Sequence, residues 1–172
     1  MASIQACEIP PDSLLRKYND GMGFADCYVI EVAGTVSQAT FIEAFYTSPL
    51  FKLERTILKH LASKPATDAD AQRLAAGRSD RFSAWRVEGR SSSELLLADF
   101  TGRTRSWLMA LPLDGPTKAT ATRLYFGSAV VPMSISGSGE PGMGWLFHAL
   151  LGFHRLYSRL LLRAASQRVR SN

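Results

Sequence analysis

Residues 144–168, GWLFHALLGFHRLYSRLLLRAASQR, form the stretch that decides the fold of this chain. Apolar residues recur in it at intervals of three and four, which is the spacing of one face of a long α-helix. The stretch follows residues 132–143, PMSISGSGEPGM, whose glycine, serine and proline content is typical of a loop. A single long helix after such a loop predicts a lid that lies across a sheet formed by the preceding residues.

The preceding sequence predicts that sheet. Four strand-like runs, residues 81–88, 94–98, 103–113 and 118–131, are separated by short segments with the Gly, Ser, Asp and Pro content of hairpin turns. Short turns join neighbouring antiparallel strands, so the four runs predict a meander. Upstream, Phe24–Ala33 (FADCYVIEVA) predicts a first strand because it is rich in β-branched and aromatic residues.

Three helices are expected between the first strand and the meander. Ser37 is a suitable N-cap for the first helix, which should continue to residue 45 or 46. Pro49 suits the first position of the second helix, and residues 68–76 predict a third with Gly77 as its stop. Helices are therefore segregated from strands. The expected fold class is α+β, a curved antiparallel sheet of one N-terminal strand plus a four-strand meander, wrapped on the long C-terminal helix.

Length and composition indicate one domain, residues 1–172. Hydrophobic residues make up 46% of the chain and charged residues 20%, as in ordinary globular proteins. Two cysteines do not suggest a disulfide framework, and residues 1–10 lack the basic start and apolar core of a signal peptide, so a cytoplasmic location is expected. His148, His154 and Arg155 interrupt the last helix before it could span a membrane.

The net charge of +5 comes entirely from the last helix. The chain up to residue 154 has equal numbers of basic and acidic residues, and no acid follows Glu140. The excess consists of Arg155, Arg159, Arg163, Arg168 and Arg170. Cations near the C-terminal end of a helix interact favourably with its dipole, and no nucleic-acid-binding module accompanies them, so nucleic acid is not an expected partner. The row Arg155, Arg159 and Arg163 is most simply a solvated stripe, and contact with an anionic membrane surface is the alternative.

Neither a cofactor nor a metal ion is expected from the motifs. Residues 137–142 (GSGEPG) match the G-x-G-x-x-G pattern, but a dinucleotide site needs a second parallel strand after the helix, and Glu140 would repel a pyrophosphate. His148 and His154 are six residues apart, which places them on different sides of the helix, so they cannot share a metal ion as an i, i+4 pair would. No residue set defines a reaction.

The candidate ligand-binding residues come from the strands and the last helix. Arg105, Trp107 and Met109 share one face of a strand because side chains alternate. Such a stripe suits a cavity wall with a clamp for carboxylate or phosphate, or a core strand with an arginine that reaches solvent. Asp99 fits the first place of a type I turn that ends at Gly102, and it could also lie at a cavity mouth.

The full set of candidate cavity residues is Trp85, Asp99, Arg105, Trp107, Met109, Tyr125, Phe147, Leu151 and His154. On the last helix, the residues expected to face the sheet are Phe147, Leu150, Leu151, His154, Tyr157 and Leu161.

Several short strings support a family resemblance. They are IPPDS at 9–13, FADCY at 24–28, AD at 98–99, FHR at 153–155 and LLLR at 160–163. With these strings, the chain resembles an uncharacterised bacterial family of the helix-grip superfamily, which includes the START domains and birch-pollen-type allergens. Members occur alone or fused behind epimerase-like domains, and the glycine-rich residues 136–144 depart from their pattern. The resemblance implies a helix-grip fold and, by analogy, a hydrophobic ligand cavity between sheet and helix, with no catalytic residues to carry over.

Three functions are compatible with the sequence. The leading hypothesis is a domain that binds an apolar or amphipathic small molecule, with the glycine-rich loop as the gate. The second is an enzyme of the cyclase or dehydratase type, in which Asp99, Arg105 and His154 would supply acid–base and charge-stabilising groups. The third is a protein-interaction module, for example a homodimer.

Overall fold

The computed structural model describes the backbone of residues 3–19, 24–62, 65–113, 120–131 and 144–171. Within the helices, the side chains of residue 54, residues 57–62, residues 144–155 and residue 171 are outside the described part.

A seven-stranded antiparallel sheet forms the body of the described structure, in the order β1-β2-β7-β6-β5-β4-β3. The strands are β1 (Gln5–Ala6), β2 (Phe24–Ala33), β3 (Arg81–Phe82), β4 (Trp85–Arg90), β5 (Glu94–Asp99), β6 (Thr104–Leu113) and β7 (Ala121–Val130). β2 pairs with β7 along its whole length, from Phe24 opposite Val130 to Ala33 opposite Ala121. The early strand therefore adds to the sheet beside the last strand, and the predicted α+β class is confirmed.

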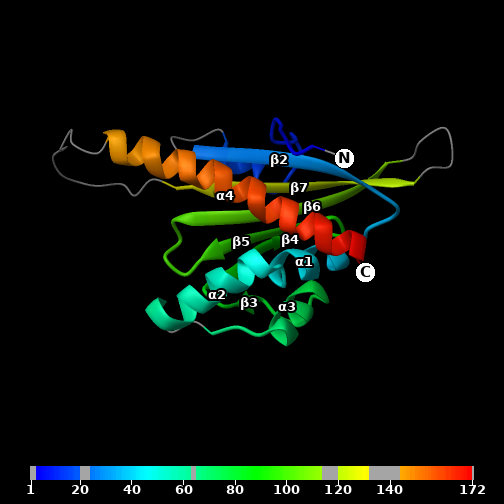
Figure 1. The fold of residues 1–172 in the computed structure, drawn as a ribbon, viewed down its shortest axis with the longest axis horizontal. Helices are drawn as coiled ribbons and strands as arrows, with labels where there is room; N and C mark the ends of the chain where they lie inside the picture. The colour runs from blue at the N-terminus through cyan, green and yellow to red at the C-terminus, as the bar shows by residue number, and fades with distance from the viewer. Residues whose placement is uncertain (1–2, 20–23, 63–64, 114–119, 132–143, 172) are drawn as a thin grey trace.

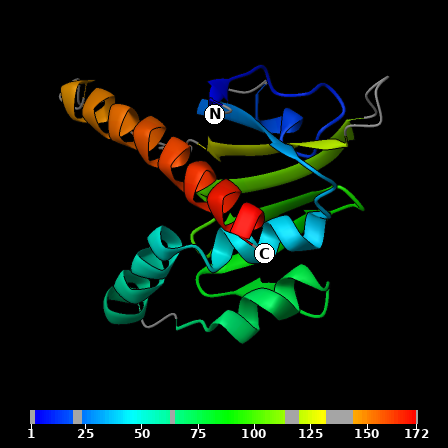
Figure 2. The ribbon, with the colours of Figure 1, turned by 45° about the vertical axis from the view of Figure 1, so that its right-hand side comes forward.

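The helices lie together on one side of this sheet (Figures 1 and 2). They are α1 (Gln38–Tyr46), α2 (Pro49–Ala62), α3 (Asp68–Ala75) and α4 (Gly144–Ser171). The predicted start signals are confirmed: the Ser37 side chain accepts a hydrogen bond from the Thr40 N–H, and Pro49 is the first residue of α2. α4 crosses the sheet as one continuous helix, so the predicted C-terminal helix is also confirmed (Figure 1).

The sheet contains two strands that the sequence did not predict. β1 is only two residues long, too short for an alternating pattern to reveal it. The predicted run 81–88 is in fact two strands, because Ser83 adopts a φ of 52° and turns the chain back on itself. Phe82 then lies opposite Trp85 in a tight hairpin. A left-handed backbone at a serine is uncommon, so nothing in the composition of this run indicated the turn.

Each face of the sheet carries a hydrophobic core. The inner face packs against the helices, and its core includes Tyr28, Phe41, Phe45, Tyr46, Leu97, Leu108, Phe126, Leu161 and Leu162. The outer face packs against the N-terminal segment, residues 3–19, through Ile9, Leu15, Cys27, Leu96, Trp107, Met109 and Ala129. Coverage on both sides explains why β5 is an unbroken run of buried residues rather than an alternating one.

The two cysteines lie under the N-terminal segment, and both are free thiols. Their sulfur atoms are 3.0 Å apart, and the Cys7 N–H donates to the Cys27 carbonyl. The shared hydrogen bond raises the pKa of Cys27, as does its burial, and the same bond lowers the pKa of Cys7. This contact helps to hold the N-terminal segment against β2.

Candidate functional site

A pocket of about 270 Å³ lies between the inner face of the sheet and α4. Its apolar lining consists of Phe45, Phe51, Ala84, Trp85, Phe100, Phe126, Tyr157 and Leu161, and its polar lining of Asp99, Thr104, Arg105, Ser106, Ser128 and Ser158. Residues from α1, α2, α4 and four strands therefore meet around one space. The sheet supplies one wall, and α4 supplies the opposite wall.

An aromatic cluster forms the floor of the pocket. The rings of Phe45 and Phe126 have centroids 4.8 Å apart, and Phe45 also contacts Phe51 at 5.9 Å. Phe45 and Phe126 are almost fully buried, with 1% and 4% of their surface exposed. Because these rings are buried and packed against one another, the protein core itself holds the apolar floor in place.

A polar row follows one line across the strands beside this floor. The strand register places Asp26, Ser128 and Ser106 next to one another on β2, β7 and β6. Ser128 Oγ donates to Asp26 Oδ1 at 2.6 Å, and the Ser106 and Tyr46 hydroxyl groups are 3.4 Å apart. The pocket wall is therefore amphipathic, with aromatic rings on one side and hydroxyl groups on the other.

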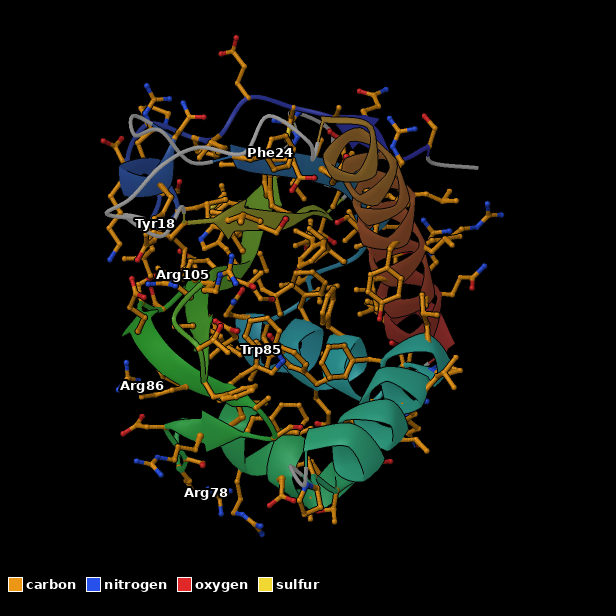
Figure 3. All side chains as sticks on the ribbon, turned by 90° about the vertical axis from the view of Figure 1, so that its left-hand side faces the viewer. Tyr18, Phe24, Arg78, Trp85, Arg86 and Arg105 are labelled. Atoms are coloured by element: carbon orange, nitrogen blue, oxygen red, sulfur yellow. The ribbon has the colours of Figure 1, made fainter. Side chains whose placement is uncertain are left out.

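Two polar atoms of residues that line the pocket are buried and have no hydrogen-bond partner in the described structure. They are Trp85 Nε1 and Ser158 Oγ. Ser158 is 1% exposed, so its hydroxyl group is shielded from bulk solvent. A buried donor without a partner costs about 1–3 kcal/mol, and such groups are rare in folded proteins. Figure 3 shows Trp85 directed into the space between the strands and the helices.

Asp99 lies at the pocket and organises a turn, which confirms the turn prediction. The Gly102 N–H donates to the Asp99 carbonyl at 3.0 Å, and Gly102 has a φ of 71°. Asp99 Oδ1 accepts from the backbone N–H groups of Arg103 and Thr104. Burial alone would raise the pKa of Asp99, but these bonds and one from Thr101 outweigh it, so the pKa lies below the usual value. The carboxylate stays ionised at neutral pH, which does not suit a proton donor.

Replacing Asp99 by alanine is expected to destabilise the protein by about 1 kcal/mol at neutral pH, through loss of these hydrogen bonds. Because the pKa is depressed in the folded state, this contribution is present above the ordinary value of 3.8 and is lost as the pH falls below it. Urea unfolding of both proteins from pH 7 to pH 2.5 should therefore show curves that converge in acid. D12A, at an exposed carboxylate, is the control and should match wild type.

Arg105 borders the pocket, but its guanidinium group is engaged on the outer face. Arg105 Nε lies 2.6 Å from Glu88 Oε2 and 2.9 Å from the hydroxyl group of Tyr18. The group also lies over the Tyr18 ring, 4.8 Å from its centroid (Figure 3). Arg105 therefore anchors the N-terminal segment, and the predicted carboxylate or phosphate clamp is absent from the described pocket wall.

Three more predicted cavity residues lie on the outer face. Trp107, Met109 and Tyr125 share one face, as alternation predicts, but this face packs under the N-terminal segment. They therefore do not line the pocket between the sheet and α4. A period of two groups residues on one face, but it does not say which face the helices cover. On α4, Tyr157 and Leu161 do contact the inner core. Phe147, Leu151 and His154 are outside the residues whose side chains are described, and the gate loop 132–143 is outside the described residues.

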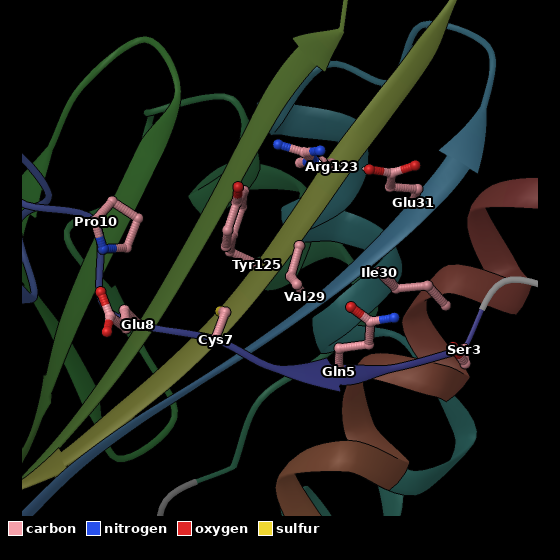
Figure 4. Close-up of a pocket in the computed structure, with 10 residues that line it drawn as sticks. All are labelled: Ser3, Gln5, Cys7, Glu8, Pro10, Val29, Ile30, Glu31, Arg123 and Tyr125. Atoms are coloured by element: carbon pink, nitrogen blue, oxygen red, sulfur yellow. Dashed lines mark hydrogen bonds and ion pairs between the residues drawn. The ribbon is translucent and has the colours of Figure 1, made fainter.

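A second, larger groove of about 590 Å³ lies on the outer face beside β1 (Figure 4). Its lining includes Gln5, Cys7, Tyr125, Glu31 and Arg123, and Arg123 Nε donates to Glu31 Oε1 at 2.8 Å. Both side chains of this pair are about half exposed. Because solvated, already paired groups line it, this groove offers less to an apolar ligand than the inner pocket does.

The residues that sequence reasoning missed are the polar row and the aromatic floor. The polar row could not be predicted because the neighbours of Asp26, Ser106 and Ser128 depend on the strand register. The aromatic floor was missed because Phe45 and Phe51 lie in helices whose apolar pattern is that of any helix packed on a core. The serines on β6 and β7 were the available signal, because hydroxyl groups within apolar strands need a partner or a role.

Among the described residues, no group of three or more His, Cys, Asp or Glu side chains could hold a metal ion. No helix in the described part of the chain has the length and apolar character needed to cross a membrane. Comparison with protein-family models, curated proteins and solved structures gives no match for this chain.

Proposed function

We propose that this protein binds a small apolar or amphipathic molecule in the pocket between the sheet and α4. The observation that carries the proposal is the combination of a preformed aromatic floor with two buried, unpartnered polar atoms, Trp85 Nε1 and Ser158 Oγ. A ligand with a hydrogen-bond acceptor beside an apolar body would cover the rings and give these donors a partner. Ligand sites typically combine apolar walls with a few placed polar groups in this way.

A helix-grip fold is part of this proposal. It is supported by the order of elements, in which β2 precedes three helices, the remaining strands follow, and α4 lies across the inner face. The proposed fold is further supported by the pocket between these two elements, the sheet and α4.

The pocket volume and charge define the class of ligand. A volume of 270 Å³ corresponds to roughly nine water molecules at their liquid volume of about 30 Å³ each, which suits a ligand of about ten non-hydrogen atoms. Asp99 is ionised at the pocket, Asp26 lies behind Ser128, and Arg105 is bound to Glu88 instead. A carboxylate would therefore face negative charge without a described cation, so the expected ligand is neutral.

The cyclase or dehydratase alternative has less support. It requires Asp99 and Arg105 to act on one substrate, but Asp99 is held by the turn and Arg105 by Glu88 and Tyr18. No observation of the described residues favours a proton-transfer pair in the pocket. The interaction-module alternative is tested by the oligomeric state alone.

The proposal is tested with native mass spectrometry of the purified protein and with titration of 2-naphthol, a neutral probe of suitable size. The variant A84F adds a ring to the pocket wall and should weaken 2-naphthol binding by at least about tenfold. The control A33F, at an exposed position at the end of β2, should bind as wild type does. Thermal unfolding would show that both variants are folded.

The anion 2-naphthoate should bind at least about tenfold more weakly than 2-naphthol, because its charge must be desolvated beside Asp99. A co-purified neutral molecule that is absent from A84F would further support the proposal. Saturable binding of 2-naphthol that is equal in A84F and A33F would contradict it, as would the absence of both a co-purified molecule and probe binding.

A further inference from the structure

The C-terminal half of α4 exposes leucine and arginine side chains on one face. Leu156 is 57% exposed and Leu160 is 44% exposed, and Arg159, Arg163 and Arg170 are also exposed. At about 100° per residue, these five positions fall within an arc of roughly 100°. The opposite side of the same turns carries the buried residues that contact the sheet. This face therefore stays outside the core.

The exposed face carries positive charge that no carboxylate of the described residues neutralises. The sequence of α4 contains five arginines and no aspartate or glutamate. Among the described residues, no carboxylate forms an ion pair with Arg159, Arg163 or Arg170, and the Arg159 guanidinium lies 5.4 Å from the centroid of the Tyr28 ring. Four arginines elsewhere in the described structure, Arg55, Arg73, Arg105 and Arg123, do pair with carboxylates.

A groove of about 460 Å³ runs between α4 and the β1 edge, and the arginines of the exposed face line it together with aliphatic side chains. Ile4 and Ile30 contribute to one side, and Leu156 and Leu160 to the other. The surface therefore combines exposed aliphatic side chains with guanidinium groups.

We propose that this face of α4 docks on a lipid bilayer surface that contains anionic phospholipid. Guanidinium groups bind phosphate oxygens in bidentate geometry, and neighbouring leucines can enter the acyl-chain boundary. A nucleic acid, or a peptide of acidic residues alone, would pair with the arginines but would leave Leu156 and Leu160 in water. The inference is independent of the proposed ligand. If the protein both binds a ligand in the pocket and docks on a bilayer, then Tyr157 and Leu161, which line the pocket from the same helix, lie close to the membrane. The membrane would then be a source of apolar ligands.

The test is co-sedimentation of the full chain with phosphatidylcholine vesicles, with and without phosphatidylglycerol. Each basic residue near an anionic surface contributes about 1 kcal/mol, so the triple variant R159Q/R163Q/R170Q should lower the partition coefficient by about 100-fold. The control R78Q/R86Q/R103Q removes the same charge from exposed arginines elsewhere and should retain most binding. Figure 3 shows Arg78 and Arg86 pointing outward from another part of the molecule.

The double variant L156S/L160S tests the apolar part. It should weaken binding at least about fivefold, because aliphatic area no longer leaves water. Equal loss in both triple variants would overturn the proposal, since binding would then follow net charge alone. Equal sedimentation with pure phosphatidylcholine, or none with either vesicle, would also overturn it. Light scattering without vesicles identifies the competing occupant, because a stable dimer that L156S/L160S dissociates would assign this face to a second copy of the chain.

Discussion

Replacing Glu94 by alanine is expected to lower the free energy of unfolding by about 3–5 kcal/mol. Glu94 is buried on the outer face, where its Oε2 accepts hydrogen bonds from Trp107 Nε1 at 2.7 Å and from the Leu14 N–H at 2.8 Å. Hydrogen bonds to a charged group each contribute about 1.5–3 kcal/mol, and the variant leaves two donors without a partner. Trp107 is fully buried, so water cannot replace the lost acceptor.

Thermal unfolding measures this effect, and a shift of roughly 10 °C or more is expected for a chain of this length. E94Q keeps one acceptor oxygen and should lose about half as much. E31A is the matched control, because Glu31 forms an exposed ion pair with Arg123 and such pairs contribute at most about 1 kcal/mol. A melting temperature for E94A within a degree or two of wild type would show that Glu94 does not hold the N-terminal segment on the sheet.

Replacing Gly127 by alanine is expected to destabilise the fold by about 3 kcal/mol. A Cβ atom at this position of β7 would lie 2.5 Å from Leu15 Cδ2, 2.9 Å from the Asp26 carbonyl oxygen and 3.0 Å from Trp107 Cε3. Leu15 and Trp107 are fully buried, and the carbonyl belongs to the paired strand β2, so none of the three can move freely. The strand must shift or the N-terminal segment must lift away.

Chemical denaturation of G127A measures the loss, and G89A is the matched control within the same sheet. A Cβ at Gly89 would lie 3.2 Å from Leu14 Cδ1, the end of a half-buried side chain that can turn aside. G89A should therefore change the free energy of unfolding by less than about 1 kcal/mol. Equal effects of the two substitutions would mean that the close packing at Gly127 is not what holds β7 against the N-terminal segment.

Local signals in the sequence were sufficient for most elements. The sequence bounds of β2 match the structure residue for residue, and Ser37, Pro49 and Gly77 mark helix ends as expected. Capping residues, prolines and glycines act on backbone within a few residues, so the local sequence is enough to locate the ends of these elements. The strands that the sequence did not predict depend instead on residues far away in the chain. β1 and β3 are held by a partner strand, and the partner of a two-residue strand is not encoded in its own pattern.

The candidate site was predicted in part. Trp85 and Asp99 do line the inner pocket, while Trp107, Met109 and Tyr125 lie on the outer face. The reason is the N-terminal segment, which covers the outer face and gives it a core of its own. With both faces buried, an apolar stripe on a strand no longer identifies the side that faces the helices.

The sequence by itself determined the α+β class, the long C-terminal helix and the position of its excess positive charge, because these depend on periodicity and composition. Only the tertiary structure decided which strand face meets α4, which polar atoms are left without partners, and which side of α4 stays exposed. These properties arise from register and from contacts between residues far apart in the chain, such as Leu14 with Glu94 and Ser128 with Asp26. Pairings of that kind carry no local signature, so they emerge only when the segments are packed together.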